Sequence, residues 1–311
     1  MEEKQSALGI FGILKEAFKI TIKNGNIVLF ISFFMFIYFY LLEFANHLIL
    51  APILSDFASK YAINPDIISL SKTNPKLYKE ILKDIRFFLL FGLIKLAISS
   101  LILVISLSSI IHATHEAYTY KVLTLKDIFL NFKMKWKKPF VTSIHLVFLT
   151  FAFVALFVFV LGFVSVITEG PVLSILEGGL LIFGAFFCVY FSVVWILSLV
   201  VSILEENSSG MKAIERARDV MKGKKKLQGF LLMVILIFAS VAISESLALL
   251  EKNTTKSRFT WMVISIPNTW LFCLKKLFLF IVFTLFYHEC KKGHSVEDKT
   301  CGYAPISGAE V

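Results

Sequence analysis

Six long apolar stretches separate this chain from ordinary soluble domains. A helix needs about 20 apolar residues to cross the roughly 30 Å hydrocarbon core of a bilayer. Hydrophobic residues make up 57% of the chain and charged residues 17%, whereas soluble domains average about 45 to 50% and about 25%. These values exclude an ordinary soluble enzyme and predict an all-α, polytopic transmembrane helix bundle with six spans. The stretches are Ile27 to Ile49, Phe87 to Ile111, Val141 to Ile167, Leu180 to Leu204, Phe230 to Leu250 and Trp261 to Tyr287.

The sixth stretch is less regular than the others. It contains Pro267, which removes a backbone hydrogen bond from a helix, and the charged pair Lys275 and Lys276. Two interpretations stay open: one kinked span, or a short segment followed by a span that starts near Asn268. Both count as one crossing.

Lys and Arg are distributed unevenly between the two sets of connecting segments. The terminal segments and the loops on their side hold twenty, whereas the loops on the other side hold nine. Basic residues favour the side that is not translocated, so both termini are predicted to be cytosolic. The chain is thus expected to comprise a cytosolic segment over residues 1–26, a six-span domain over 27–289 and a cytosolic tail over 290–311. The start of the chain does not have the pattern of a cleavable signal peptide, so residues 27–49 are expected to act as a retained signal anchor.

Three further segments have the pattern of amphipathic interfacial helices. Residues 7–22 carry apolar residues at spacings of three and four, with lysines beside that stripe. Residues 124–136 follow a capping pattern made by Thr124 and Asp127, and a luminal helix that starts at Pro75 is predicted to run into the second span. The stripe of the first segment consists of Ala7, Ile10, Phe11, Leu14, Phe18 and Thr21.

Residues 204–229 form the most distinctive hydrophilic segment. Ser209 is expected to cap a short helix over residues 211–221, and Gly223 to end it in a left-handed conformation. Its basic residues are explained either by ordinary retention of positive charge in the cytosol, which we favour, or by a specific anionic-lipid site. The apolar face of the helix holds Met211, Ile214, Ala217 and Met221. The candidate lipid contacts are Lys212, Arg216, Lys222, Lys224, Lys225 and Lys226.

The net charge of +10 lies in short blocks between apolar runs. A nucleic-acid-binding face would instead interleave basic and aromatic residues on one surface. We therefore expect the lipid bilayer, including its anionic headgroups, as the partner of these blocks, and no nucleic acid.

Besides Lys276, four charged residues lie inside the predicted spans: Glu43, Lys95, Glu245 and Lys275. At about 1.5 Å per residue, all four fall near one plane in the luminal half of the membrane. Charges at such depth are functional candidates by default. Three interpretations are open: side chains that snorkel to the luminal interface, which we favour, ion pairs between spans one, two, five and six, and the polar floor of a pocket for a charged solute.

The sequence contains no strong catalytic or cofactor signature. It has no nucleophile elbow, no Walker loop and no pair of aspartates within a span. His112 and His115 would need a third ligand from elsewhere to hold a metal, so interfacial imidazoles are the favoured interpretation. The four cysteines show no disulfide or metal spacing, and Cys290 is either a palmitoylation site or a spare cytosolic thiol. We expect no catalytic residue, cofactor or metal site.

Three motifs resemble those of a known family. They are LEENSSGMKAIERARDVMKGK, YKVLTLKDIFLNFKMKWKKPF, and FTLFYHECKKGH with the tail CGYAPI. They resemble a plant family of polytopic membrane proteins of uncharacterised function, sometimes labelled polyadenylate-binding-protein-binding proteins. The helix with Ala213 and Ala217 is also similar to the membrane domain attached to some bacterial glycerophosphodiester phosphodiesterases, although the chain has no room for their catalytic barrel. The resemblance implies a six-span endomembrane protein and assigns no catalytic residue.

Two classes of function follow. The first is a non-enzymatic multi-pass protein of the endoplasmic reticulum or another endomembrane, with the plasma membrane and vacuole as further locations, that organises, traffics with or tethers membranes through its basic cytosolic helices. The second is a small-solute transporter or channel built on the luminal-half charges. Carriers usually show interrupted spans at corresponding positions of two repeated halves, and only the last span is interrupted here. The first class is therefore ahead, and an intramembrane lipid enzyme ranks third.

Overall fold

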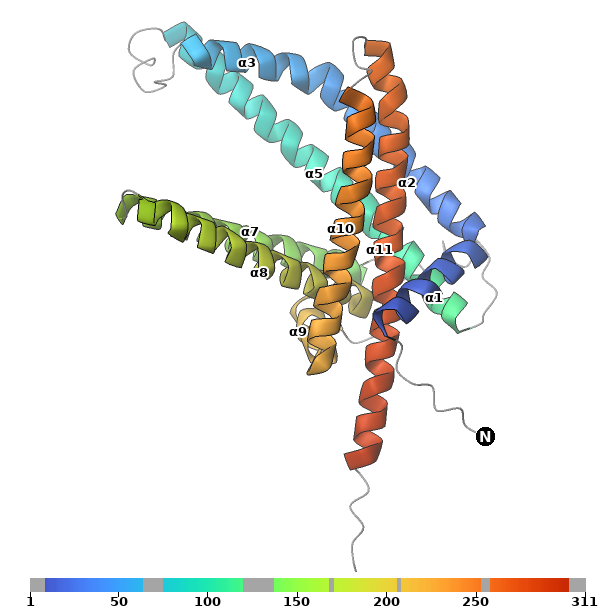
Figure 1. Ribbon diagram of the computed structural model, residues 1–311. Coiled ribbons are helices and arrows are strands. Elements are labelled where there is room, and N and C mark those ends of the chain that lie inside the picture. Colours follow the sequence, from blue (N-terminus) through green and yellow to red (C-terminus); the bar gives the residue numbers. More distant parts are fainter. Residues whose placement is uncertain are drawn as a thin grey trace, which may run out of the picture.

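The computed structural model describes residues 9–63, 75–119, 137–167, 171–205, 208–252 and 258–301. Every secondary-structure element in these ranges is a helix (Figure 1), which confirms the predicted all-α fold. In chain order the elements are α1 (Ile10–Lys23), α2 (Gly25–Ala45), the π-helical turn η1 (Asn46–Leu50), α3 (Ala51–Ile63), α5 (Pro75–Tyr118), α7 (Lys137–Ile167), α8 (Pro171–Leu204), α9 (Met211–Val220), α10 (Lys224–Lys252) and α11 (Arg258–Cys301).

Six helical segments are long and apolar enough to cross a membrane, and each overlaps one of the six predicted stretches. α5 and α11 have 44 residues each. At 1.5 Å per residue such a helix is about 66 Å long, whereas a bilayer with its headgroups is about 45 Å thick. Both helices therefore exceed the membrane thickness. α5 begins at Pro75, as the sequence predicted.

The structure decides the form of the sixth predicted span and changes the end of the first. α11 is continuous through Pro267, so the sixth stretch is one helix and not a short segment followed by a separate span. Proline is tolerated in spanning helices because neighbouring groups compensate for the lost backbone bond. The first predicted span corresponds to α2. The helical chain does not end at Ile49 but continues from α2 through η1 into α3 as far as Ile63.

α11 is the central helix of the bundle. It contacts α1, α2, α5, α8, α9 and α10. In its most apolar stretch 56% of the residues are buried, whereas in the most apolar stretch of α7 none are. α7 packs mainly on α8, and the C-terminal end of α7 and the N-terminal end of α8 lie apart from the other helices (Figure 1).

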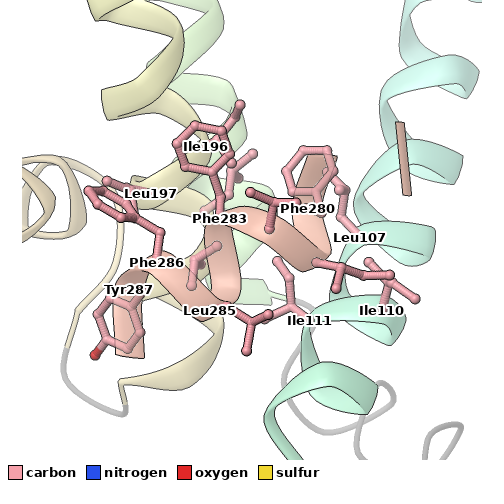
Figure 2. Close-up of a cluster of buried hydrophobic side chains, with 14 of the residues drawn as sticks. Leu107, Ile110, Ile111, Ile196, Leu197, Phe280, Phe283, Leu285, Phe286 and Tyr287 are labelled. Carbon is pink, nitrogen blue, oxygen red and sulfur yellow. The ribbon is translucent and has the colours of Figure 1, made fainter. Parts of the chain in front are cut away.

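Most of the buried apolar side chains lie at one end of the bundle, here termed the dense end. It is formed by the C-terminal halves of α5, α8 and α11 together with α1 and α9. Figure 2 shows how side chains from three helices interdigitate there. Because lipid is as apolar as leucine, helices in a membrane associate through close contact rather than through burial from water. The cluster includes Leu107, Ile110, Ile111, Ile196, Leu197, Phe280, Phe283 and Phe286.

Three buried hydroxyl side chains at the dense end bond to the backbone of their own helix. Thr114, Ser198 and Thr284 each donate to the backbone carbonyl four residues earlier, at 2.6 to 2.7 Å. A polar group without a partner is costly in an apolar interior. These bonds allow small polar residues to occupy helix interfaces, where they let the backbones approach closely.

Gly229 permits the closest contact between α10 and its neighbours. A Cβ atom at this position would lie 3.1 Å from the ring of Phe286 on α11 and 3.3 Å from Val193 on α8. Both neighbours are buried, so neither has room to move away. Glycine is therefore required by the approach of three helices, not by the backbone conformation.

α1 packs on the bundle with a face that differs from the predicted stripe. Ile13, Ala17 and Ile20 are buried, whereas Phe11 is 82% exposed and Phe18 is 58% exposed. The apolar residues cover more than half of the helix circumference, so the pattern alone did not determine which part meets protein. Phe18 nevertheless contacts the ring of Phe278 on α11 at 4.7 Å. The predicted helix over residues 124–136 lies outside the described residues.

We predict that Gly229→Leu lowers the free energy of unfolding by about 1 to 3 kcal/mol, because the side chain overfills a closely packed contact between three helices. Gly92→Leu is the matched control, since nothing lies within 4 Å of a Cβ atom there. Thermal unfolding of both variants in detergent measures the effect. Equal melting temperatures for the two variants would show that the contact at Gly229 is not tight.

Candidate functional site at the dense end

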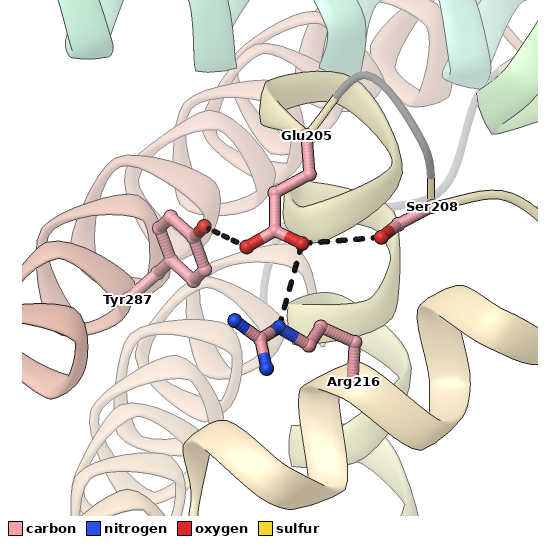
Figure 3. A network of polar contacts seen from close by, with 4 residues as sticks. All are labelled: Glu205, Ser208, Arg216 and Tyr287. Carbon is pink, nitrogen blue, oxygen red and sulfur yellow. Dashed lines mark hydrogen bonds and ion pairs between the residues drawn. The ribbon is translucent and has the colours of Figure 1, made fainter. Parts of the chain in front are cut away.

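The carboxylate of Glu205 connects three elements at the dense end (Figure 3). It accepts a hydrogen bond from the hydroxyl of Tyr287 on α11 at 2.7 Å and another from Ser208 at 3.1 Å. Its second oxygen also lies 3.6 Å from Nε of Arg216 on α9. Glu205 directly follows the last residue of α8. One side chain therefore fixes α8, α9 and α11 relative to one another.

The contacts of Glu205 differ in burial and hence in strength. Tyr287 is 1% exposed, whereas the side chain of Arg216 is 55% exposed. Solvent screens an exposed ion pair, which typically contributes 0 to about 1 kcal/mol. A hydrogen bond from a buried hydroxyl to a carboxylate is charge-assisted and is stronger. The contact between Glu205 and Tyr287 is therefore the main stabilising part of the network.

Gly210 fixes the start of α9 against α7. Its φ angle is +59°, a left-handed conformation that glycine adopts without strain. Its backbone N–H donates to the hydroxyl of Thr142 on α7 at 2.9 Å, and a Cβ atom would lie 3.3 Å from His145. Gly210 is thus the N-cap of α9, which corrects the prediction that Ser209 caps this helix.

The end of α9 agrees with the sequence prediction. Gly223 follows the helix with a φ angle of +66°, the left-handed conformation expected of a glycine after a helix C-terminus. α10 begins directly afterwards at Lys224. The segment is therefore short and turns sharply at both ends, which confines α9 to the surface of α8, α7 and α11.

The apolar face of α9 is buried against protein. Of the four residues predicted for this face, Ile214, Ala217 and Met221 are buried, but Met211 is 62% exposed. Ala213 and Val220, which the prediction omitted, are buried as well. The face is therefore used for contact with the bundle and not for insertion into lipid, and the opposite, charged face is turned outward.

The candidate lipid-contacting residues lie on this charged face and at the start of α10. Lys212, Lys222 and Lys226 are exposed, Lys225 is half-buried, and Arg216 is held by Glu205; the side chain of Lys224 lies outside the described ones. Arg218 is also exposed, and the sequence analysis did not include it.

Lys222 makes a local ion pair at the end of α9. Its ammonium lies 2.9 Å from a carboxylate oxygen of Asp219, and both side chains are largely exposed. The hydrogen bond from Lys222 holds the pKa of the Asp219 carboxyl below its usual range. The pair contributes little stability because solvent screens it, so Lys222 stays accessible to other anions.

The opposite side of the α11 end connects to α5. Nδ1 of His115 and Nε2 of His288 are 3.0 Å apart, and the two rings stack with centroids 5.0 Å apart. Tyr118 donates a hydrogen bond to Glu289 at 3.4 Å, and Lys292 forms an ion pair with the same carboxylate at 3.5 Å. Three consecutive residues of α11, from Tyr287 to Glu289, thus bind elements on both sides of the helix.

The second histidine of the predicted pair therefore meets an imidazole from another helix. His288 is the additional partner that the sequence analysis could not identify. Among the described residues no group of three metal-ligating side chains comes together. The two acidic residues Glu205 and Glu289, each just beyond a long apolar run, were the signal for this network that the sequence analysis missed.

The four charges in the other half of the bundle do not pair with one another among the described residues, so ion pairing, one of the three open interpretations, does not occur there. Glu43 accepts a hydrogen bond from Thr269 at 2.7 Å. Lys95 donates to Oδ1 of Asn46 at 3.3 Å, and Lys275 donates to the hydroxyl of Ser244 at 2.7 Å. Each bond joins two different helices, so the charges connect the spans through neutral partners.

The fourth charge, Glu245, is exposed on α10, and no hydrogen bond or ion pair to it occurs among the described residues. Neutral residues can bond to the other three charges because each lies on a neighbouring helix, level with the charged group.

Cys290 is buried at 1% exposure, as is Cys273. A palmitoylation site must be reached by the modifying enzyme, so the structure does not support that interpretation of Cys290. The alternative was a spare cytosolic thiol; the structure places the thiol inside the dense end, where it fills space as a small apolar group.

The fold and the network at the dense end define an all-α protein in which six helices are long and apolar enough to cross a membrane, which indicates an integral membrane protein. The chain belongs to the family described as Domain of unknown function (DUF8558), which matches residues 1–300. Searches among curated proteins and among solved structures gave no match.

We predict that Tyr287→Phe lowers the free energy of unfolding by about 1 kcal/mol and Glu205→Ala by about 2 to 3 kcal/mol, because the second change leaves a buried hydroxyl without its acceptor. The double variant is expected to lose less than the sum of the two effects. Thermal unfolding in detergent provides the measurement.

Lys222→Met serves as the control for this double-mutant cycle, because its ion pair is exposed and its loss should change stability by less than about 0.5 kcal/mol. Additive effects of the two changes at Glu205 and Tyr287 would contradict the hydrogen bond between them.

Proposed function

We propose that this protein is a non-enzymatic, multi-pass membrane protein of the endomembrane system that binds anionic membrane surfaces through the charged face of α9 and the start of α10. The observation that carries the proposal is that the apolar face of α9 is buried in the bundle while its basic residues are turned outward. A helix that inserts into lipid would need the same apolar face for the bilayer. α9 instead presents its charges from a fixed support, which suits contact with headgroups or with an opposing membrane.

The charges are sufficient for measurable binding. A Lys or Arg near an anionic surface contributes about 1 kcal/mol, and the effect falls off within a Debye length of about 8 Å at physiological salt. Three exposed lysines, Lys212, Lys222 and Lys226, therefore contribute together about 3 kcal/mol. The binding free energy of the three lysines together exceeds that of any single lysine, so we expect membrane binding to depend on the whole group.

The orientation and location are part of the same proposal. Basic residues concentrate at the dense end, which favours a cytosolic position for this end and for both termini. Membership of the plant family of polytopic proteins, with a site in the endoplasmic reticulum or another endomembrane, is proposed from the resemblance of the motifs and awaits direct localisation.

The second candidate function is a small-solute transporter or channel. It ranks lower because three of the four span charges are held by hydrogen bonds to neighbouring helices, and a charge fixed in this way stabilises the bundle. The feature in its favour is a groove beside Glu43.

We predict that the full-length protein in nanodiscs of neutral lipid captures vesicles that contain phosphatidylserine and leaves neutral vesicles unbound. Replacing Lys212, Lys222 and Lys226 by Gln should reduce capture at least tenfold, because the three contribute about 3 kcal/mol together. Flotation of the vesicles measures the bound fraction, and raising the salt concentration should weaken capture.

The matched control replaces Lys76, Lys79 and Lys83 by Gln. These three lysines are equally exposed but lie at the start of α5, on the far side of the spans. Both faces of a nanodisc are accessible, so the control removes the same charge from the opposite surface. Equal loss of capture in the two triple variants would mean that total charge, and not the face of α9, causes binding.

We predict that tags at both termini are digested when protease is added to sealed microsomes, because the distribution of Lys and Arg places both ends in the cytosol. A tag inserted between residues 64 and 74 should be protected until detergent opens the membrane. Survival of either terminal tag would show that the predicted orientation is wrong, and α9 would then face the other side of the membrane.

A further inference from the structure

A groove lies between α2 and α11 in the half of the bundle away from the dense end. It has a volume of about 290 Å³ and combines aromatic walls with polar side chains. The rings of Phe39 and Phe272 meet edge to face, with centroids 5.6 Å apart. The groove is lined by Phe39, Leu42, Glu43, Asn46, Asn268, Thr269 and Phe272.

Glu43 is the only residue with a formal charge among those lining this groove. It lies about 24 Å along the helix from Ile27, at 1.5 Å per residue, and so within the membrane-compatible part of α2. One of its oxygens accepts the hydroxyl of Thr269. In the described chain no cation pairs with the carboxylate.

Three lysines lie beside the groove or on the same helices, and each is already engaged with another group. Lys95 donates to Asn46 and Lys275 donates to Ser244. The ammonium of Lys276 lies over the ring of Phe272, 5.6 Å from its centroid. A half-buried carboxylate in low dielectric is stabilised strongly by an opposite charge. The second oxygen of Glu43 is therefore available to a cation, and we infer that a ligand supplies that cation.

The remaining polar groups of the groove match a hydrogen-bonding head. The amide nitrogen of Asn46 and the side chain of Asn268 make no hydrogen bond within the described chain, and Asn268 is exposed. The groove is open on one side, next to exposed Phe272, and a lipid tail can pass through this opening. Its size is near the lower limit of small-molecule sites, about 300 Å³, so it accommodates a head and not a whole lipid.

We propose that the groove between α2 and α11 binds the primary ammonium head of a single-chain amphiphile, with Glu43 as counter-ion and the hydrocarbon chain in the lipid beside Phe272. An ammonium over the ring of Phe39 adds a favourable interaction, whereas the ring of Phe272 already has the ammonium of Lys276 over it. A phospholipid with an amine head fits less well, because its phosphate would lie against the carboxylate of Glu43.

The test is equilibrium binding of radiolabelled dodecylamine to the full-length protein in phosphatidylcholine nanodiscs, with empty nanodiscs subtracted. The wild-type protein is expected to bind saturably. Glu43→Gln should weaken binding at least tenfold, since it removes the charge but keeps an oxygen that accepts the Thr269 hydroxyl. Unlabelled dodecylamine should compete, and dodecanol and phosphatidylethanolamine should not.

Glu245→Gln is the matched control, because Glu245 also carries a charge inside a span but lies exposed on α10 and does not line the groove. Its binding should equal that of the wild type. Leu42→Trp tests the position of the site independently of charge, since the larger ring fills the groove and should abolish binding.

Unchanged binding by folded Glu43→Gln, or an equal loss in Glu43→Gln and Glu245→Gln, would overturn the proposal. Equal competition by dodecanol would overturn the role of the ammonium charge, and competition by phosphatidylethanolamine would overturn the preference for a single-chain amine. If Glu43→Gln does not fold, as judged by its melting temperature, Leu42→Trp decides: retained binding would place the amine elsewhere.

Discussion

Contact between the buried part of α11 and the helices around it is the constraint on which the rest of the structure depends. From Phe280 to Cys290 this helix is surrounded by α1, α5, α8 and α9. Lipid offers apolar side chains an equally favourable environment, so the helices stay together only where side chains interlock or hydrogen-bond. Both occur here, since Phe283 and Phe286 fill the interior while Tyr287 and Glu289 make polar contacts at its edge.

The two halves of the bundle are held together in different ways. The dense end has a continuous apolar cluster and two polar networks that share one turn of α11. In the other half, α2, α5, α10 and α11 are connected by separate hydrogen bonds from Glu43, Lys95 and Lys275. Such bonds between membrane helices contribute about 0.6 kcal/mol on average. A groove is thus easier to maintain in this half, away from the interlocked side chains.

The orientation of α9 follows from its contacts with the bundle. Its buried residues Ala213, Ile214 and Ala217 set its rotation about its own axis, and the exposed ion pair of Arg216 with Glu205 adds to these contacts. The same rotation turns Lys212 and Lys222 outward. The charged surface that we propose for membrane binding is therefore a direct consequence of contacts inside the protein.

The sequence by itself determined the number of spans, the helical fold and the turn at Gly223, because these follow from the length of apolar runs and from local backbone conformation. Tertiary structure alone decided which face of α1 is buried and which neutral groups bond to Glu43 and Lys95. It also decided that Gly210, and not Ser209, is the N-cap of α9. The physical reason is that residues facing lipid and residues facing protein are equally apolar in a membrane. Hydrophobic pattern therefore identifies what lies in the bilayer, but only the arrangement of neighbouring helices decides what each side chain touches.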